Sequence, residues 1–187
     1  KGNKRKGTSS VIMNYAHIKK SDIANGPGVR VSLFVSGCTH HCKGCFNPET
    51  WDFDYGQFFD DDVMDMILGY LSREYISGLS LLGGEPFEAE NLPCLLTLVK
   101  KVKDNYPAKT IWCYTGYDFE KDIINVMGHK RSEVMPFLSY IDVIVDGEFV
   151  EEKKDLKLRF RGSSNQRIID VRQSLLSGSI CLAEEFY

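Results

Sequence analysis

Three cysteines lie within eight residues of one another, at Cys38, Cys42 and Cys45. Three residues separate the first two and two residues separate the last two, so the three thiols can converge on one inorganic centre. The segment directly follows Val29–Val35, where Val and Leu alternate with other residues at the two-residue period of a β-strand. We therefore expect a cysteine-bearing loop at the end of a strand.

This cysteine set lacks a fourth ligand, and three interpretations follow. A structural zinc site takes four protein ligands, and His40 or His41 could complete a Cys₃His set. A [4Fe–4S] cluster normally takes four cysteines, so a cluster held by three would leave one iron open to a small molecule. Unligated thiols are the third interpretation. The spacing alone does not separate zinc from iron–sulfur.

The other three cysteines are scattered along the chain. Cys94 and Cys113 lie in apolar surroundings, where a cysteine acts as a small hydrophobic residue, and we expect both in the core. Cys181 is left unassigned. Because no secretory signal precedes these cysteines, we expect a reducing, cytoplasmic setting in which disulfides are not favoured.

Length and charge limit the number of domains and the kinds of partner that the chain can have. A chain of 187 residues with 43% hydrophobic residues can bury a sizeable core, and we expect one domain over residues 13–187. Residues 1–12 contain several basic side chains without a following apolar segment, which predicts a solvated tail outside the domain. The net charge of −3 gives no reason to expect nucleic acid as a partner, and no apolar stretch is long enough for a membrane span.

Predicted strands and helices alternate about five times along the chain. This alternation is typical of parallel strands joined by crossover helices, hence of an α/β fold. The length is short for a closed eight-unit barrel, so we expect a partial, open β/α barrel of about five to six parallel strands with outer helices. A flat doubly wound sheet is the alternative. The expected strands are Met13–Ile18, Val29–Val35, Leu79–Leu82, Thr110–Tyr114, Ile141–Val145 and Arg167–Val171. The first expected helix begins after Asp60 and stops at Gly78.

The turn Gly83-Gly84-Glu85-Pro86 follows one of these strands at its carboxyl end, where α/β folds build their sites. Glycines allow a ligand to approach the backbone, and the carbonyls and Glu85 could accept hydrogen bonds from an ammonium group. The alternative is a plain strand-to-helix turn with Pro86 at the helix start. Beside a three-cysteine loop on the preceding strand, the ligand site is the favoured interpretation.

Together, the cysteine motif and this turn resemble the radical S-adenosylmethionine superfamily. Five motifs in order along the chain, one of which contains the three cysteines, resemble more narrowly the anaerobic ribonucleoside-triphosphate reductase activating proteins. The segment Asp52–Asp62 has no match to the pattern. The five motifs are Asn25–Arg30 (NGPGVR), Cys38–Phe53 (CTHHCKGCFNPETWDF), Trp112–Tyr117 (WCYTGY), Asp142–Phe149 (DVIVDGEF) and Arg161–Val171 (RGSSNQRIIDV).

The resemblance implies that Cys38, Cys42 and Cys45 bind a [4Fe–4S] cluster whose fourth iron takes S-adenosylmethionine. The reduced cluster would cleave this cofactor, and the resulting 5′-deoxyadenosyl radical would remove a hydrogen from a glycine Cα of the partner reductase, leaving a glycyl radical. An electron donor such as flavodoxin is implied as a second partner. The implied cofactor-binding residues are Gly44, Cys45, Phe46, Gly83, Gly84, Glu85 and Asp146.

Several alternatives remain open beside this reading. Asp146 could instead serve as a helix cap or turn residue. Asn25–Arg30 could contact the partner or could be a plain turn. Arg159 and Arg161 could contact the partner, although a solvated face is the favoured interpretation for both. The function itself has two alternatives: a radical S-adenosylmethionine enzyme acting on another glycyl-radical partner, or a non-catalytic metal-binding module.

Overall fold

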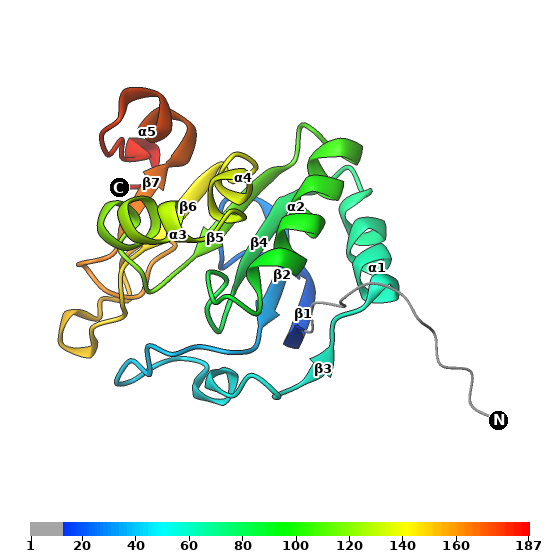
Figure 1. Cartoon of the computed structure of the whole chain (residues 1–187), viewed down its shortest axis with the longest axis horizontal. Coiled ribbons are helices and arrows are strands. Elements are labelled where there is room, and N and C mark those ends of the chain that lie inside the picture. The colour runs from blue at the N-terminus through cyan, green and yellow to red at the C-terminus, as the bar shows by residue number, and fades with distance from the viewer. Residues whose placement is uncertain (1–12) are drawn as a thin grey trace.

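The computed structural model describes residues 13–187, and the predicted basic tail at 1–12 lies outside the described residues. Seven strands form one mixed sheet in the order β3-β1-β2-β4-β5-β6-β7 (Figure 1). The strands are β1 (Asn14–Asp22), β2 (Val29–Val35), β3 (Gln57–Phe58), β4 (Ile76–Gly83), β5 (Thr110–Tyr114), β6 (Val143–Asp146) and β7 (Arg167–Asp170).

The helices lie between and after these strands. No helix of residues 13–187 is long and apolar enough to span a bilayer. The α- and π-helical elements are α1 (Asp61–Leu71), α2 (Leu92–Asn105), the π-helical segment η2 (Phe119–Met127), α3 (Gly128–Lys130), α4 (Val134–Leu138) and α5 (Val171–Ser177). Short 3₁₀ turns are η1 (Pro48–Trp51), η3 (Glu151–Lys153) and η4 (Glu184–Phe186).

The expected partial barrel of five to six parallel strands is wrong. Only β2, β4, β5 and β6 run parallel to one another, whereas β1 pairs antiparallel with β2 and with β3, and β7 pairs antiparallel with β6. Helices do connect the four parallel strands, as the alternation predicted. The turn between β1 and β2 and the irregular segment between β6 and β7 contain no crossover helix, so the chain reverses at both places.

Gly78 also differs from its expected role as a helix stop. Helix α1 begins after Asp60, whose carboxylate accepts a hydrogen bond from the Val63 amide at 2.9 Å, but it ends at Leu71. Gly78 lies inside β4, where an added Cβ would meet the Thr110 carbonyl oxygen at 1.9 Å. The glycine is therefore required by the close approach of β5 rather than by a helix end.

The two faces of the sheet bury different side chains. Odd-numbered residues of β2, such as Val31 and Leu33, join one large core with the apolar faces of α1 and α2, which Figure 1 shows packed on the same side of the sheet. On the opposite face, Trp112 and Val145 form a smaller cluster with Ile168. Arg30 and Ser32 also belong to this second face, so it combines apolar and polar groups.

Arg30 is fully buried and connects four segments of the chain. Its guanidinium donates to the Leu79 carbonyl at 2.8 Å, the Ser80 hydroxyl at 2.7 Å, and both the carbonyl and hydroxyl of Thr110 at 2.8 and 3.0 Å. A longer bond of 3.4 Å reaches the Pro27 carbonyl in the β1–β2 turn. Burial lowers the pKa of Arg30 to about 10, which leaves it charged at neutral pH. In this structure the expected Asn25–Arg30 turn is thus fastened to β4 and β5.

We predict that Arg30→Lys lowers the free energy of unfolding by about 3 kcal/mol, because an ammonium cannot reach all of these acceptors from one position. Urea unfolding of the metal-free protein under anaerobic reducing conditions measures the change. Arg172→Lys, on the exposed side of α5, is the matched control and should change stability by less than about 0.5 kcal/mol. A loss below about 1 kcal/mol for Arg30→Lys would contradict the structural role.

Candidate functional site

The carboxyl ends of the four parallel strands bring together the segments that the sequence singled out. The cysteine loop leaves β2, the Gly83–Pro86 turn leaves β4, and further connections leave β5 and β6. The Gly84 amide donates to the Val35 carbonyl at 2.7 Å, and the Glu85 amide donates to the Gly37 carbonyl at 2.7 Å. The cysteine loop and the glycine turn therefore share backbone hydrogen bonds.

Glu85 is 1% exposed, and its carboxylate accepts hydrogen bonds from three segments. One oxygen accepts from the Phe87 amide and the Thr115 hydroxyl, both at 2.9 Å. The other oxygen accepts from the Gly116 amide at 2.8 Å and contacts His40 Nε2 at 3.2 Å. A buried carboxylate needs such donors to remain charged. The Glu85 side chain is thus occupied by protein groups, so only its backbone is left for the expected ammonium contact.

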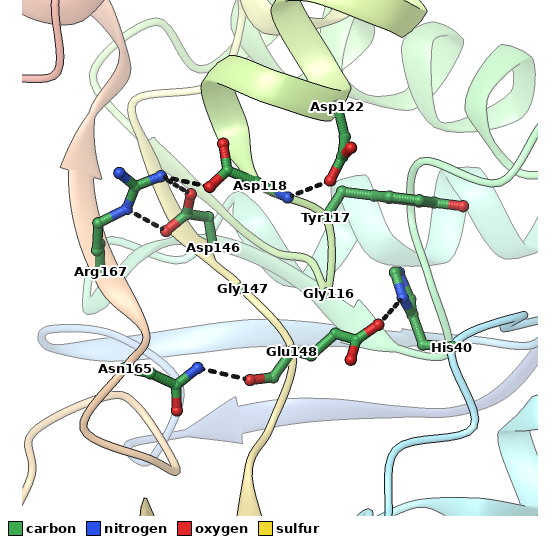
Figure 2. A pocket seen from close by; sticks show the side chains of 10 residues that line it. All are labelled: His40, Gly116, Tyr117, Asp118, Asp122, Asp146, Gly147, Glu148, Asn165 and Arg167. Carbon is green, nitrogen blue, oxygen red and sulfur yellow. Dashed lines mark hydrogen bonds and ion pairs between the residues drawn. The ribbon is translucent and has the colours of Figure 1, made fainter.

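His40 joins the cysteine loop to two carboxylates. Its second ring nitrogen, Nδ1, lies 3.0 Å from Glu148, and Figure 2 shows the imidazole facing that residue. Burial opposes protonation of His40, but the hydrogen bonds and charges of Glu85 and Glu148 outweigh it and raise its pKa to about 9. At neutral pH the imidazolium therefore donates from both nitrogens, which holds the loop against β4 and β6.

The three clustered cysteines line one cavity of about 580 Å³. All three are free thiols and partly buried. Burial is the largest influence on Cys38 and, reinforced by Glu85 and Cys42, raises its pKa to about 12. Burial also raises the pKa of Cys42. The Cys38 and Cys42 thiols therefore stay protonated at neutral pH unless a metal replaces the proton, so metal binding at these two residues would release protons.

Cys94 and Cys113 lie where the sequence predicted. Cys113 is fully buried in the large core, and Cys94 is partly buried and packs against it. Burial raises the pKa of Cys94 to about 11 and that of Cys113 well above its usual value. Cys181 lies near the end of the chain beside Ser177, away from the cysteine loop. Neither Cys94 nor Cys113 lines the cavity.

Gly83 and Gly84 both line this cavity. Glycine is required at both positions, but for a different steric reason from the one expected. A Cβ on Gly83, at φ +106°, would lie 2.8 Å from Phe34 Cα. A Cβ on Gly84 would lie 2.5 Å from the Gly37 carbonyl oxygen. Both glycines are therefore required by neighbouring backbone at the end of β2, and the role of their own backbone toward a ligand stays a prediction.

Gly44 and Phe46 lie on either side of Cys45, and Phe46 but not Gly44 lines the cavity. Gly44 has φ +73°, a conformation that favours glycine, and an added Cβ would meet the Glu151 side chain at 3.1 Å. The Phe46 ring is 60% exposed and its centroid lies 5.0 Å from that of Phe149. An exposed aromatic ring beside the cavity is available to pack against a flat ligand group.

Asp146 lies in a second cavity of about 460 Å³, which shares His40 with the first (Figure 2). Its carboxylate accepts from Arg167 Nε at 3.0 Å and from the Phe119 amide at 2.9 Å, at the start of η2. Arg167 also contacts Glu120 at 3.0 Å. The N-cap residue of η2 is Asp118, so Asp146 contacts the start of this helix without being its cap, and none of its contacts requires a cofactor.

Two residues that the sequence analysis did not single out also hold the cysteine loop. Glu88 accepts from the Thr39 amide at 2.9 Å and from the Thr39 hydroxyl at 2.6 Å. Asn91 donates to the Ser36 and Glu85 carbonyls, both at 2.9 Å, instead of capping α2. The available signal was the presence of three polar residues between the glycine turn and an apolar helix, Glu88, Glu90 and Asn91, which is more than a cap requires.

The donor set fits an iron–sulfur cluster with a small-molecule ligand better than a Cys₃His zinc site. His40 uses both nitrogens on carboxylates, and His41 packs edge-on against Trp51 with the ring centroids 4.8 Å apart. Within residues 13–187, no three His, Cys, Asp or Glu side chains are grouped to hold one metal ion. Tyr114 and Arg161 line the cavity, and each has one buried polar atom, Oη and Nε respectively, without a hydrogen-bond partner among residues 13–187. These two atoms are therefore available to a ligand.

Comparison with known proteins supports the cluster. Residues 24–169 match the family described as a 4Fe-4S single cluster domain. The chain is 42% identical over 158 residues to the anaerobic ribonucleoside-triphosphate reductase-activating protein of Vibrio cholerae, covering 83% of this chain and 97% of that protein. The identically named protein of Escherichia coli is 41% identical over 162 residues, covering 86% of this chain and all of that protein. The chain therefore belongs to the family of anaerobic ribonucleoside-triphosphate reductase-activating proteins.

Proposed function

We propose that this protein is an enzyme that activates an anaerobic ribonucleoside-triphosphate reductase by generating a glycyl radical on it. The single observation that carries the proposal is the cavity of about 580 Å³, in which the three thiols of the cysteine loop lie with the backbone of the Gly83–Glu85 turn. Its volume is in the usual range for a small-molecule site. The names of the relatives supply the class of protein substrate.

Cys38, Cys42 and Cys45 are the proposed ligands of a [4Fe–4S] cluster, which would supply the electron that cleaves S-adenosylmethionine to methionine and a 5′-deoxyadenosyl radical able to take a hydrogen from a glycine Cα. The residues of this chain hold the thiols in position. The loop is fastened by Glu85, Glu88 and the backbone of β4. Three ligands from one loop would leave the fourth iron without a protein ligand and so free to take S-adenosylmethionine.

The proposed S-adenosylmethionine contacts are groups that line the same cavity, together with Gly44, which lies beside them in the chain. Backbone carbonyls of Gly83 and Gly84 are the proposed acceptors for the amino group, because the Glu85 carboxylate is already saturated by protein donors. Gly44 and Phe46 flank Cys45, and the Phe46 ring offers a surface for the adenine. Asp146 is not included, since Arg167 and η2 occupy its oxygens.

The protein's further contribution is to limit what the radical can meet. Apolar side chains, among them Phe34, Leu82 and Phe149, line the cavity beside the cysteines. They keep water and hydrogen-bonded solvent from much of the wall. We also propose an electron donor such as flavodoxin and a cytoplasmic setting, in which the free thiols would remain reduced.

We predict that alanine at Cys38, Cys42 or Cys45 removes most of the bound iron and acid-labile sulfide, because each thiol would ligate a different iron. Cys94→Ala and Cys113→Ala are matched controls that keep the cluster and lose only about 1 kcal/mol of stability. Iron and sulfide analysis after anaerobic reconstitution decides between these outcomes. A full cluster in Cys42→Ala would overturn the ligand assignment.

We predict that the reduced protein, mixed with S-adenosylmethionine and the anaerobic reductase, produces a glycine-centred radical and 5′-deoxyadenosine. If the partner's glycine carries deuterium at Cα, the deuterium should appear in the 5′-deoxyadenosine, and the hyperfine pattern in electron paramagnetic resonance should change. Other glycyl-radical proteins serve as control partners. Deuterium-free product, or no radical despite an intact reduced cluster, would contradict the proposed function.

A further inference from the structure

The irregular segment between β6 and β7 contains a hairpin that forms part of the cavity wall. A β-bridge joins Lys154 to Ser163, and the Ser164 amide donates to the Lys153 carbonyl at 2.9 Å. We call residues 154–163 the docking hairpin. Six members line the cavity that the three cysteines also line: Asp155, Leu156, Leu158, Phe160, Arg161 and Gly162.

One side of the docking hairpin is fixed to the protein. Phe160 has φ +56°, a strained conformation for an aromatic residue, and its ring centroid lies 5.4 Å from that of Trp112. The Arg161 guanidinium lies over the Tyr187 ring at 4.3 Å and donates to the Gln166 carbonyl at 2.8 Å. Packing therefore holds the hairpin in place, although the segment contains almost no regular secondary structure.

The other side of the docking hairpin faces solvent and carries an apolar residue. Leu156 is 88% exposed, the most exposed of the large apolar side chains in the described part of the chain. Such a side chain lowers its free energy when a partner covers it. Because Leu156 also lines the cavity, a partner that covers it lies at the cavity entrance.

Positive charge surrounds this apolar residue. Lys154, Lys157 and Arg159 are exposed, and Asp155 is the only acidic residue of the docking hairpin. The neighbouring Glu151 and Glu152 contact Lys43 at 3.0 and 3.6 Å, which offsets one of their two negative charges. The whole chain has a net charge of −3, so this basic entrance differs in sign from the protein as a whole. Its complement is an acidic partner surface.

We propose that the docking hairpin binds an acidic segment of the reductase as that segment enters the cavity, with Leu156 as the apolar contact and Lys157 and Arg159 as the charged contacts. This inference rests on the proposed function and names the surface that recognises its protein substrate. A segment carrying the target glycine must reach the cysteine end of the cavity and therefore passes the hairpin. An electron donor has no need to enter the cavity, so it is the less suitable occupant.

The test measures association rather than chemistry. Lys157→Glu/Arg159→Glu and Leu156→Asp are titrated with the anaerobic reductase in the presence of S-adenosylmethionine, at low and at high salt. Each variant should weaken binding by at least about tenfold at low salt, and the charge variant should also lose most of the salt dependence. Iron content and thermal unfolding confirm that each variant is loaded and folded.

Matched controls carry the same changes elsewhere on the surface. Leu176→Asp changes a leucine of α5 that is 76% exposed, and Lys130→Glu/Arg172→Glu reverses two exposed charges away from the cavity. Both should bind the reductase within about twofold of the unchanged protein.

The results separate this proposal from the proposed function. If the unchanged protein activates the reductase while the hairpin variants bind as tightly as the controls, the docking proposal is overturned and the function stands. If the unchanged protein binds through the hairpin yet forms no glycine radical, the function fails and the docking surface stands. If the variants bind the reductase normally but are reduced more slowly by flavodoxin, the hairpin serves the electron donor and the proposal is wrong.

Discussion

A carboxylate that is removed from water needs donors for both of its oxygens, and Glu85 finds them in three segments. The Phe87 amide belongs to its own turn, Thr115 and Gly116 follow β5, and His40 belongs to the cysteine loop. These bonds set the relative positions of the loop and two strand ends. Removing the charge would leave several buried donors without an acceptor, so the site depends on this one residue for its shape.

Arg30 has a role similar to that of Glu85, but toward the amino ends of the parallel strands. Its guanidinium joins β2 to β4 and β5, as the Glu85 carboxylate joins the ends of the same strands near the cysteines. The two buried charges are not paired with each other: Arg30 donates to uncharged acceptors, whereas Glu85 accepts from uncharged donors and contacts His40. The sheet is therefore fastened by polar contacts at both ends and by apolar packing between them.

Much of this arrangement was predictable from the sequence, and the failures have local causes. The period of Val29–Val35 and Thr110–Tyr114 predicted β2 and β5 with their observed bounds. Strand direction at the sheet edges was not predictable from alternation, because the connection between β6 and β7 has the length of a crossover but contains no long helix. The role predicted for Gly78 was wrong for a similar cause. Glycine is required there because a carbonyl of β5, which is distant in sequence, lies against it. Likewise, the cysteine spacing and glycine turn located the site, but the hydrogen-bond partners of Glu85 and Asp146 depend on residues brought together only by folding.

The backbone hydrogen bonds at the base of the cysteine loop have a consequence for how the protein recovers after exposure to oxygen. The Gly37 and Cys38 amides donate to the Thr50 and Trp51 carbonyls at 2.8 and 3.2 Å, so the protein itself closes the loop. The entropy of ordering these residues is therefore lost during folding and not when metal binds. A molecule whose cluster has been destroyed by oxidation would retain a preshaped loop, and repair would require fresh iron, sulfide and reduced thiols but no refolding.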